Sequence, residues 1–535
     1  MKRMETRENS ASEPGGDCQG FRVERRRAVL LAAIAFLGLA LRLWGIRWGA
    51  PERIDLHPDE IDYIIKYAQR VSLHNLDPGF LNYPAFMMYL VSFSSAILRR
   101  LGLLHEIWQI HVVGRCWSAL FGAATAPVVY LLARELGGRA PGALLAALWT
   151  ALLPLHVWES HVAVTDVPMT FWVTLTLLAA VRLLRRDGWQ DWALAGAALG
   201  LATGSKYTAA LATVTILLAA LLNGRAPARR ARGLAIAGAT ALLACFLVTP
   251  YSFLRLPDTL AAMRFESQHT MGHHFGFSVP ADGPQYRRYV YQLVAAWPFS
   301  FGIGLYLSVA AGTLWALLRL DRRSAIVLGF AALFFGVTGS WTLTPLRYYL
   351  PLLIVGALMA GLWQGAWLAD GSRGRRAVAL VAVVFALGYT SVFCWQTTRR
   401  YGHETRVEAA RWLESWKPAG TLIGIGWGRY LALPLPGSTI AYTVGRESDL
   451  ADRRKMASFD LVEVSSLVYR RHYRHGDAGA KAIYDGLGKP ESNLRLVKRF
   501  EADFLNKKLY TALDPMFEGY FLSPTLEFYE PVTRP

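Results

Sequence analysis

The feature that most constrains this chain is a series of apolar runs between residues 27 and 394, separated by short segments rich in arginine. About 20 apolar residues in a helix cross the roughly 30 Å hydrocarbon core of a bilayer. Within that core, only helices and closed barrels satisfy every backbone hydrogen-bonding group. Because 53% of the 535 residues are hydrophobic, a soluble domain is excluded. The sequence predicts a polytopic α-helical membrane protein with about 11–13 transmembrane helices.

Thirteen runs are candidate spans, and several are short for a full crossing. They cover residues 27–46, 84–99, 101–115, 117–134, 141–157, 167–184, 191–203, 207–222, 232–250, 299–318, 324–341, 346–364 and 376–394. Between Tyr83 and Arg134 the chain must cross an odd number of times. One crossing needs far fewer than these roughly fifty, mostly apolar, residues. Three short or tilted crossings are therefore predicted.

The basic residues set the predicted orientation. The formal net charge is +18, and arginines cluster between the runs, at 134–139, 182–186, 225–232, 319–323 and 373–376, as in cytoplasmic loops. This distribution indicates contact with membrane lipids and no nucleic-acid partner. The N-terminus is then cytoplasmic, with residues 1–24 disordered, and the chain after about residue 395 is extracytoplasmic. We expect a multi-pass protein of the cell inner (plasma) membrane.

Residues 399–535 are polar and mixed in composition, unlike the transmembrane domain predicted for residues 25–398. Glu404 to Trp416 has the pattern of an amphipathic helix. The apolar segments that begin at Thr421 and Phe459 predict buried strands. Helices alternating with strands indicate a C-terminal extracytoplasmic α/β domain.

In this orientation, five segments meet at the outer face: residues 47–83, 159–168, 204–207, 251–298 and 341–349. The inner loops are short and basic. The candidate chemistry therefore lies on one side of the membrane.

Three carboxylates on the outer side are candidate catalytic residues. Asp59 is suited to act as a general base that deprotonates an acceptor hydroxyl or amine, and Glu60 to orient it or bind the acceptor. The alternative is a solvated acidic loop, or a cap for a helix lying on the membrane surface. Asp166 is a second active-site acid or, alternatively, the N-cap of a helix that begins near Pro168.

Four cations lie near outer ends of spans, at the depth of a lipid phosphate: Arg42, Lys206, Arg255 and Arg347. Arginine and lysine bind phosphate well. Arg347 is the strongest candidate because two tyrosines follow it, and Lys206 is second because Gly204 and Ser205 expose backbone amides. Interfacial snorkelling is the alternative for each. The predicted substrate-binding set also contains Tyr63, Tyr83, His161, Tyr207 and Tyr348.

The outer segment 251–298 contains Glu266, His269, His273 and His274. This spacing suits a metal, but no cysteine or HExxH pattern accompanies it. We interpret the segment as a loop that closes over the acceptor, and predict neither a metal nor a cofactor.

Over roughly residues 27–365, the chain resembles the lipid-carrier-dependent glycosyltransferases of the GT-C fold, glycosyltransferase family 39 type. These include the protein O-mannosyltransferases and the aminoarabinose transferase that modifies lipid A. The similarity lies in the Asp59-Glu60 pair after the first span and in five further motifs. These are Leu81-Asn-Tyr-Pro84, Arg134-Glu-Leu-Gly-Gly-Arg139, Ala163-Val-Thr-Asp-Val-Pro168, Gly200-Leu-Ala-Thr-Gly-Ser-Lys-Tyr207 and Arg347-Tyr-Tyr-Leu-Pro351.

The resemblance implies transfer of a sugar from a polyprenyl-phosphate donor, undecaprenyl in bacteria, to a glycan, lipid or protein acceptor at the outer face. It implies Asp59 as catalytic base and Asp166 as second acid. Two positions depart from the aminoarabinose branch, which has cations where this chain has Asp62 and Tyr83. The departures argue against that substrate pair and shift the phosphate role towards Arg347 or Lys206.

A glycosyltransferase is therefore the leading hypothesis. A flippase or transporter of a lipid-linked sugar is the alternative, although such proteins more often show repeats and ionisable groups at the bilayer midplane. A catalytically inactive scaffold, whose outer domain binds a partner, is a third possibility.

Overall fold

The computed structural model describes residues 15–51, 56–280, 287–416, 422–425, 440–443, 447–518 and 523–532. In this part of the chain, the helices that run along the bundle are α1 (Gly15–Leu43), α4 (Ile107–Glu135), α5 (Ala140–Leu152), α7 (Asp166–Arg182), α8 (Trp189–Ser205), α9 (Thr213–Leu222), α10 (Pro227–Val248), α14 (Ile303–Leu317), α15 (Arg322–Thr338), α16 (Leu350–Leu368) and α17 (Arg373–Thr398).

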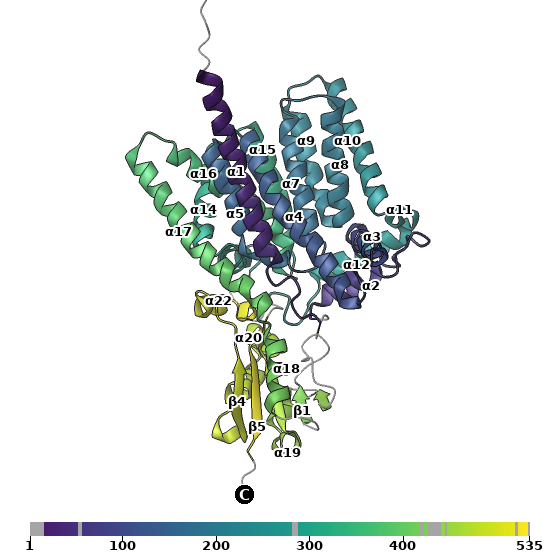
Figure 1. Cartoon of the computed structure of the whole chain (residues 1–535), viewed down its shortest axis with the longest axis vertical. Helices are drawn as coiled ribbons and strands as arrows, with labels where there is room; N and C mark the ends of the chain where they lie inside the picture. The colour runs from purple at the N-terminus through teal and green to yellow at the C-terminus, as the bar shows by residue number, and fades with distance from the viewer. Residues whose placement is uncertain are drawn as a thin grey trace, which may run out of the picture.

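Shorter elements gather at the end of the bundle that faces the C-terminal domain (Figure 1). They are the π-helix η1 (Asp59–Ile65), α2 (Lys66–Ala68), α3 (Phe86–Arg100), α6 (Pro154–Glu159), η2 (Tyr207–Ala212), α11 (Tyr251–Leu254), α12 (Leu256–Met271), η4 (Gln292–Ala296), α13 (Trp297–Phe301) and η5 (Leu346–Tyr349). The short loops between the long helices, such as 136–139 and 369–372, lie at the opposite end.

The predicted fold class is confirmed: the chain is a polytopic helical membrane protein with a C-terminal α/β domain. By length and composition, Ile107–Glu135, Pro227–Val248, Leu346–Leu368 and Arg373–Gly402 are the helices of the described part that are long and apolar enough to cross a membrane. Ala140–Leu152, Tyr207–Leu222 and Ile303–Leu317 are apolar but shorter.

The predicted helix count between residues 84 and 134 was wrong. The runs 101–115 and 117–134 form one continuous helix, α4, from Ile107 to Glu135. Arg115 looked like a break between spans, but its side chain is fully buried and its charge is paired inside the protein. Helix α3 packs against α2 and against the side of α4, at the end of the bundle that carries the short elements (Figure 1). Two helices, α3 and α4, replace the three predicted spans.

Two further boundaries differ from the prediction. Helix α1 begins at Gly15, so residues 15–24 are helical, whereas 1–14 lie outside the described residues. The segment 251–298 was predicted as a loop, yet α12 occupies Leu256–Met271. The helix was missed because its sequence mixes apolar and polar residues and has no long apolar run.

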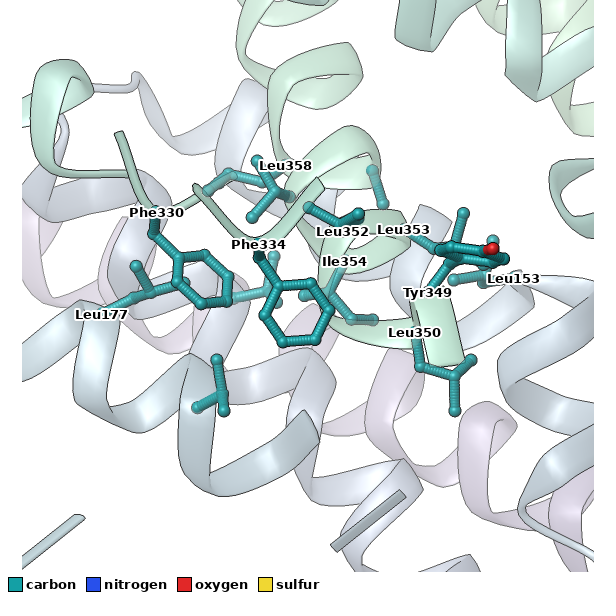
Figure 2. Packing of buried hydrophobic residues seen from close by; sticks show 14 of the residues in the cluster. Leu153, Leu177, Phe330, Phe334, Tyr349, Leu350, Leu352, Leu353, Ile354 and Leu358 are labelled. Carbon is teal, nitrogen blue, oxygen red and sulfur yellow. The ribbon is translucent and has the colours of Figure 1, made fainter. Parts of the chain in front are cut away.

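Helix α16 forms the centre of the bundle, with every side chain from Leu350 to Gly365 buried. Figure 2 shows its first turns packed against Leu153, Leu177, Phe330 and Phe334, which come from the 153 turn, α7 and α15. Interiors packed this closely resist displacement. The segment just before α16, which carries Arg347, is therefore held in place by the core.

The C-terminal domain contains a five-stranded sheet in the order β2-β1-β3-β5-β4. The strands are β1 (Leu422–Ile425), β2 (Ile440–Thr443), β3 (Leu461–Ser465), β4 (Leu494–Phe500) and β5 (Leu526–Pro531). β1 pairs in parallel with β2 and β3, and β5 pairs antiparallel with β3 and β4. The other elements are η6 (Arg399–Gly402), α18 (Thr405–Trp416), η7 (Glu447–Ala451), α19 (Arg453–Met456), α20 (Ser466–His475), α21 (Ala478–Gly486), η8 (Pro490–Ser492), α22 (Lys507–Leu513) and η9 (Pro515–Glu518).

An aromatic cluster joins this domain to the bundle. Phe299 of α13 stacks on Phe517 with ring centroids 4.3 Å apart, and also contacts Tyr510 and Phe504. Phe393 of α17 packs against the same two residues. Aromatic side chains bury large apolar areas, so this contact fixes the domain against one end of the bundle.

Candidate active site

Asp59 and Arg347 meet at the end of the bundle that carries the short elements, although 288 positions separate them. Asp59 opens the π-helix η1. Arg347 lies in η5, directly before α16. The Arg347 Nη2 group donates a short hydrogen bond to Asp59 Oδ2. A carboxylate and a guanidinium in contact form a strong, charge-assisted pair.

Asp166 and Lys206 complete a cluster of four charges. Asp166 is the first residue of α7, and Lys206 directly follows α8. The Lys206 Nζ lies 2.7 Å from Asp166 Oδ1, and the Arg347 Nε lies 3.7 Å from Asp166 Oδ2. Both cations therefore bridge to a carboxylate, and the structure brings together four residues predicted to act at one site.

Two adjoining cavities open at this cluster. The first, about 340 Å³, contains Asp59 and Arg347 in its wall, and is lined by His57, Pro58, Asp59, Tyr63, Asn82, Tyr83, Phe265, Glu266, His269, His274, Phe277, Leu343, Pro345, Arg347 and Tyr348. The second, about 420 Å³, is more apolar and is lined by Asn82, Tyr83, Lys206, Tyr207, Thr208, Ala210, Leu211, Met263, Glu266, Ser267, Thr270, Val337, Trp341 and Tyr348.

Tyr83 and Tyr348 stand at the junction of the two cavities, since both line each of them. Lys206 Nζ lies 4.3 Å from the centre of the Tyr348 ring, and the Arg347 guanidinium lies 5.5 Å from it. Rings this close to cations stabilise them. The two cations thus flank the passage from the apolar cavity to the carboxylates.

These contacts determine the ionisation of Asp59 and Tyr83, which line the first cavity. Burial alone would raise the pKa of the Asp59 carboxyl, but the charge of Arg347, helped by His57 and Lys206, outweighs it, so the pKa lies below its usual value. Burial raises the pKa of Tyr83 well above the ordinary range. Asp59 is consequently an anion near neutral pH, and Tyr83 is a neutral hydrogen-bonding group.

Glu60, predicted to act with Asp59, lies beside it in sequence but faces the protein interior. It is fully buried, and its oxygens accept bonds from Arg115 Nη2 at 2.8 Å and from the Ala163 amide at 3.0 Å. His111 Nδ1 lies 2.6 Å away. Burial opposes ionisation, yet Arg115 and His111 outweigh it and lower the pKa of Glu60 to about 2. Glu60 does not line either cavity.

Arg42 and His161, both predicted to bind substrate, are fully buried and line neither of the two cavities. The Arg42 guanidinium is completely buried and donates to Ser160 Oγ at 3.1 Å and to the Ala151 carbonyl at 3.1 Å, with His156 Nδ1 at 2.8 Å. His161 stacks on Tyr401 at 3.9 Å between ring centroids. Both side chains pack helices together, because their polar groups find partners inside the protein.

Arg255 is the fourth predicted phosphate-binding cation, and the structure places it away from the cavities. Its side chain is 41% exposed and forms ion pairs with Asp77 at 3.0 Å and Asp258 at 2.8 Å. Tyr63 lines the first cavity and stacks on Phe80. Tyr207 lines the second, and its hydroxyl donates to the Leu81 carbonyl at 3.0 Å.

Sequence reasoning did not assign several cavity residues. Asn82 donates to Glu266 Oε1 at 2.8 Å, which ties the start of α3 to α12. His269 Nδ1 and His274 Nε2 are 3.0 Å apart in the wall of the first cavity. Within the described ranges, no group of three His, Cys, Asp or Glu side chains has a metal-binding arrangement. The helical spacing of Phe265, Glu266 and His269 was the available signal, since such residues share one face.

Glu159, at the end of α6, was also missed. It is buried, and its Oε2 has no hydrogen-bond partner in the described part of the chain. Burial, opposed by Arg347 and reinforced by the negative charge of Asp166, raises the pKa of Glu159 to about 7. A carboxyl that binds its proton more tightly than an ordinary glutamate therefore lies near the charged cluster. The feature of the sequence that could have identified Glu159 was its position as a single acid inside an apolar stretch.

These residues agree with one family comparison. Residues 84–251 match the family model of the dolichyl-phosphate-mannose-protein mannosyltransferases. The match contains Asp166 and Lys206, and it confirms the predicted resemblance to lipid-carrier-dependent glycosyltransferases over this segment. A dolichyl-phosphooligosaccharide-protein glycotransferase of Archaeoglobus fulgidus is 25% identical over 170 residues, which are 31% of this chain and 28% of the relative. The chain thus matches little more than a quarter of that relative's length.

Two solved structures are similar at low sequence identity. The oligosaccharyltransferase AglB from Archaeoglobus fulgidus, in complex with an inhibitory peptide and a dolichol-phosphate, is 13% identical, with a TM-score of 0.49 over 95% of this chain and 88% of that one. ArnT from Cupriavidus metallidurans, bound to undecaprenyl phosphate, is 16% identical, with a TM-score of 0.48 over 83% of this chain and 94% of that one. Likeness at this level does not transfer an activity.

Proposed function

We propose that this chain is an integral-membrane glycosyltransferase that moves a sugar from a polyprenyl-phosphate donor to an acceptor at the outer face of the membrane, with Asp59 as general base. The observation that carries the proposal is the cluster of Asp59, Asp166, Lys206 and Arg347 at the junction of a polar and an apolar cavity. The apolar cavity suits a lipid tail, the two cations suit a phosphate, and the polar cavity suits a sugar.

The two cavities suit opposite ends of the donor, with the prenyl chain in one and the sugar in the other. The apolar cavity, with Leu211, Met263 and Val337 in its wall, suits a prenyl chain. Lys206 and Arg347 lie where the two cavities join and would bind the phosphate. The sugar then lies in the first cavity, beside Asp59 and Tyr83.

The reaction follows from this placement. The acceptor hydroxyl or amine attacks the anomeric carbon while Asp59 takes its proton. The bond from the anomeric carbon to the phosphate oxygen breaks, and its electron pair leaves with the polyprenyl phosphate. Lys206 and Arg347 stabilise the negative charge that grows on that oxygen. A single displacement inverts the configuration of the anomeric carbon.

Donor binding also activates the base. Without donor, Arg347 is paired with Asp59, and this contact makes Asp59 a weak base. A phosphate that binds Arg347 competes with the Asp59 carboxylate for the same guanidinium N–H groups. Asp59 then loses a partner and becomes more basic. The donor phosphate should therefore bind before proton transfer from the acceptor.

The test uses purified protein in lipid with a panel of labelled undecaprenyl-phosphate sugars and total membrane acceptors. Wild type, Asp59→Asn and Asp62→Asn are compared for loss of the sugar from its carrier. Asp62 lies in the same π-helix but does not line the first cavity, so Asp62→Asn makes the same charge change outside the site. Turnover by wild type and Asp62→Asn, with none by Asp59→Asn, supports the proposal. Equal turnover by all three removes Asp59 as the base.

The same preparation separates a transferase from a flippase. The four charges stand at or beside helix ends, on the side of the bundle that we propose to be the outer face, whereas transporters place ionisable groups at the midplane. A flippase would move labelled lipid between leaflets without breaking the sugar–phosphate bond. Leaflet exchange without sugar release would therefore replace the proposed function.

A further inference from the structure

The last turn of α20 in the C-terminal domain reaches the outer segments of the bundle. Arg474 is buried, and its Nη1 donates to the Gly276 carbonyl at 3.1 Å. Its Nη2 lies 3.5 Å from Thr344 Oγ1. The neighbouring His475 accepts a hydrogen bond from the Gly276 amide at 3.0 Å. One helix end thus contacts two bundle segments that are nearly seventy positions apart in sequence.

Asp514 makes this contact a buried ion pair. Its side chain is fully buried, and Oδ2 lies 3.1 Å from Arg474 Nη2. The Tyr291 hydroxyl donates to the same oxygen at 2.8 Å. Arg474 therefore links α20, the turn after α22 and the segment before η4. Removing one partner of such a pair leaves an uncompensated buried charge.

The two bundle segments are also bonded to each other. The amides of Val279, Leu343 and Thr344 donate to carbonyls of the opposite segment, to Thr342 at 3.0 Å, Thr270 at 3.1 Å and Phe277 at 3.3 Å. We call residues 270–279 and 342–345 the roof, because Phe277, Leu343 and Pro345 line the first cavity. Arg347 follows the roof by two residues.

We infer that Arg474 is a positioning residue of the transferase site, which with Asp514 holds the roof and thereby sets the position of Arg347 against Asp59. Only Pro345 and Leu346 lie between Thr344 and Arg347, so we expect a shift at Thr344 to move the Arg347 guanidinium as well. A displacement of about 1 Å is enough to lower a rate strongly. The inference rests on the proposed function for its catalytic part.

The test compares wild type, Arg474→Lys and the double variant Arg474→Met/Asp514→Asn. The double variant removes both charges together, so no unpaired charge stays buried, and we expect the fold to be retained. Arg495→Met is the matched control, because Arg495 forms an exposed pair with Glu530 in the same domain, 2.7 Å apart. The measurements are kcat and KM for the donor, and hydrogen exchange of the amides of Val279, Leu343 and Thr344.

We expect the folded double variant to lose about tenfold or more in kcat, and its KM for the donor to rise as well, because Arg347 also binds the donor phosphate. Exchange of the three roof amides should rise. Arg474→Lys should keep intermediate activity, since it retains the charge but not the fork that reaches both segments. Arg495→Met should match wild type in both measurements.

Unchanged kcat in the folded double variant overturns the inference, whether or not exchange rises. Equal exchange overturns it as well, because the roof would then be held by other contacts. If wild type turns over no donor, the proposed function has failed. The exchange measurement, which needs no substrate, still decides whether Arg474 holds the roof.

Discussion

At the scale of single residues, the adjacent acids Asp59 and Glu60 have different environments. Asp59 points into a cavity and contacts Arg347, whereas Glu60 is buried against Arg115. Successive residues of a helix face different directions, so a pair of acids in sequence does not make a pair in space. We therefore expect substitution of Glu60 to lower stability and substitution of Asp59 to lower activity.

Glu60→Gln should destabilise the protein, because Arg115 would keep a buried charge without its anion. Losing one partner of a buried pair costs about 3–5 kcal/mol. Thermal unfolding in detergent measures the loss. Asp59→Asn is the comparison and should change the melting temperature far less, since Arg347 retains Asp166. An unchanged melting temperature in Glu60→Gln, together with lost turnover, would return a catalytic role to Glu60.

Arg347→Lys should lower carrier-phosphate binding and turnover by about tenfold or more, because a single ammonium cannot replace a guanidinium that contacts two carboxylates. Binding is measured with undecaprenyl phosphate in detergent. Arg255→Lys is the control, since Arg255 lies on the surface with Asp77 and Asp258. A larger loss of binding in Arg255→Lys than in Arg347→Lys would contradict the placement of the phosphate.

Glu159 should make stability depend on pH. Its pKa is about 7 in the folded protein against 4.5 for an ordinary glutamate, so the folded state binds the proton more tightly. This stabilisation is complete below about pH 4.5 and is lost as the pH rises through about 7. The loss amounts to about 3 kcal/mol.

Melting temperatures between about pH 5 and pH 8 test this linkage. Glu159→Gln should flatten the fall that wild type shows over that range. Glu414→Gln, on an exposed position of α18, should not. The same slope in wild type and Glu159→Gln would show that the carboxyl is already ionised at low pH.

At the scale of elements, the position of Lys206 depends on how α8 packs against α10. Gly196 and Gly200 of α8 lie so close to α10 that an added Cβ would fall 2.1 Å from the Ala237 carbonyl and 2.2 Å from the Ala241 carbonyl. Small residues four apart allow membrane helices to approach closely. Lys206 directly follows α8, so this contact sets the depth of its ammonium.

Gly200→Val should push α8 away from α10. The overpacked contact costs about 1–3 kcal/mol, and we expect a lower melting temperature together with weaker binding of undecaprenyl phosphate. Gly238→Val on α10 is the matched control, because nothing lies within 4 Å of its added Cβ. Equal effects of the two substitutions would mean that helix propensity, not the contact, is responsible.

At the scale of the whole molecule, the proposed site requires the C-terminal domain to lie outside the membrane. The long helices place the loops around 319 and 369 at the end opposite that domain (Figure 1). With the four native cysteines replaced, Arg495→Cys should react with an impermeant maleimide in intact cells, and Arg319→Cys only after permeabilisation. The reverse pattern would invert the topology and place the site on the cytoplasmic face.

The order of apolar runs and basic loops determined the fold class, because hydrocarbon thickness and backbone hydrogen bonding act on local sequence. The same local pattern predicted α18 and the strands that begin near Thr421 and Phe459. It also predicted that Asp59, Asp166, Lys206 and Arg347 belong to one outer face.

Only the tertiary structure decided which charges reach the cavity. Arg42, Arg115 and Arg347 all lie near apolar segments, and their sequences do not reveal their partners. Arg42 and Arg115 are satisfied inside the protein, by Ser160 and by Glu60, whereas Arg347 reaches the carboxylates of the cavity. A charge near a membrane is defined by its partners, and these partners come from segments more than fifty residues away.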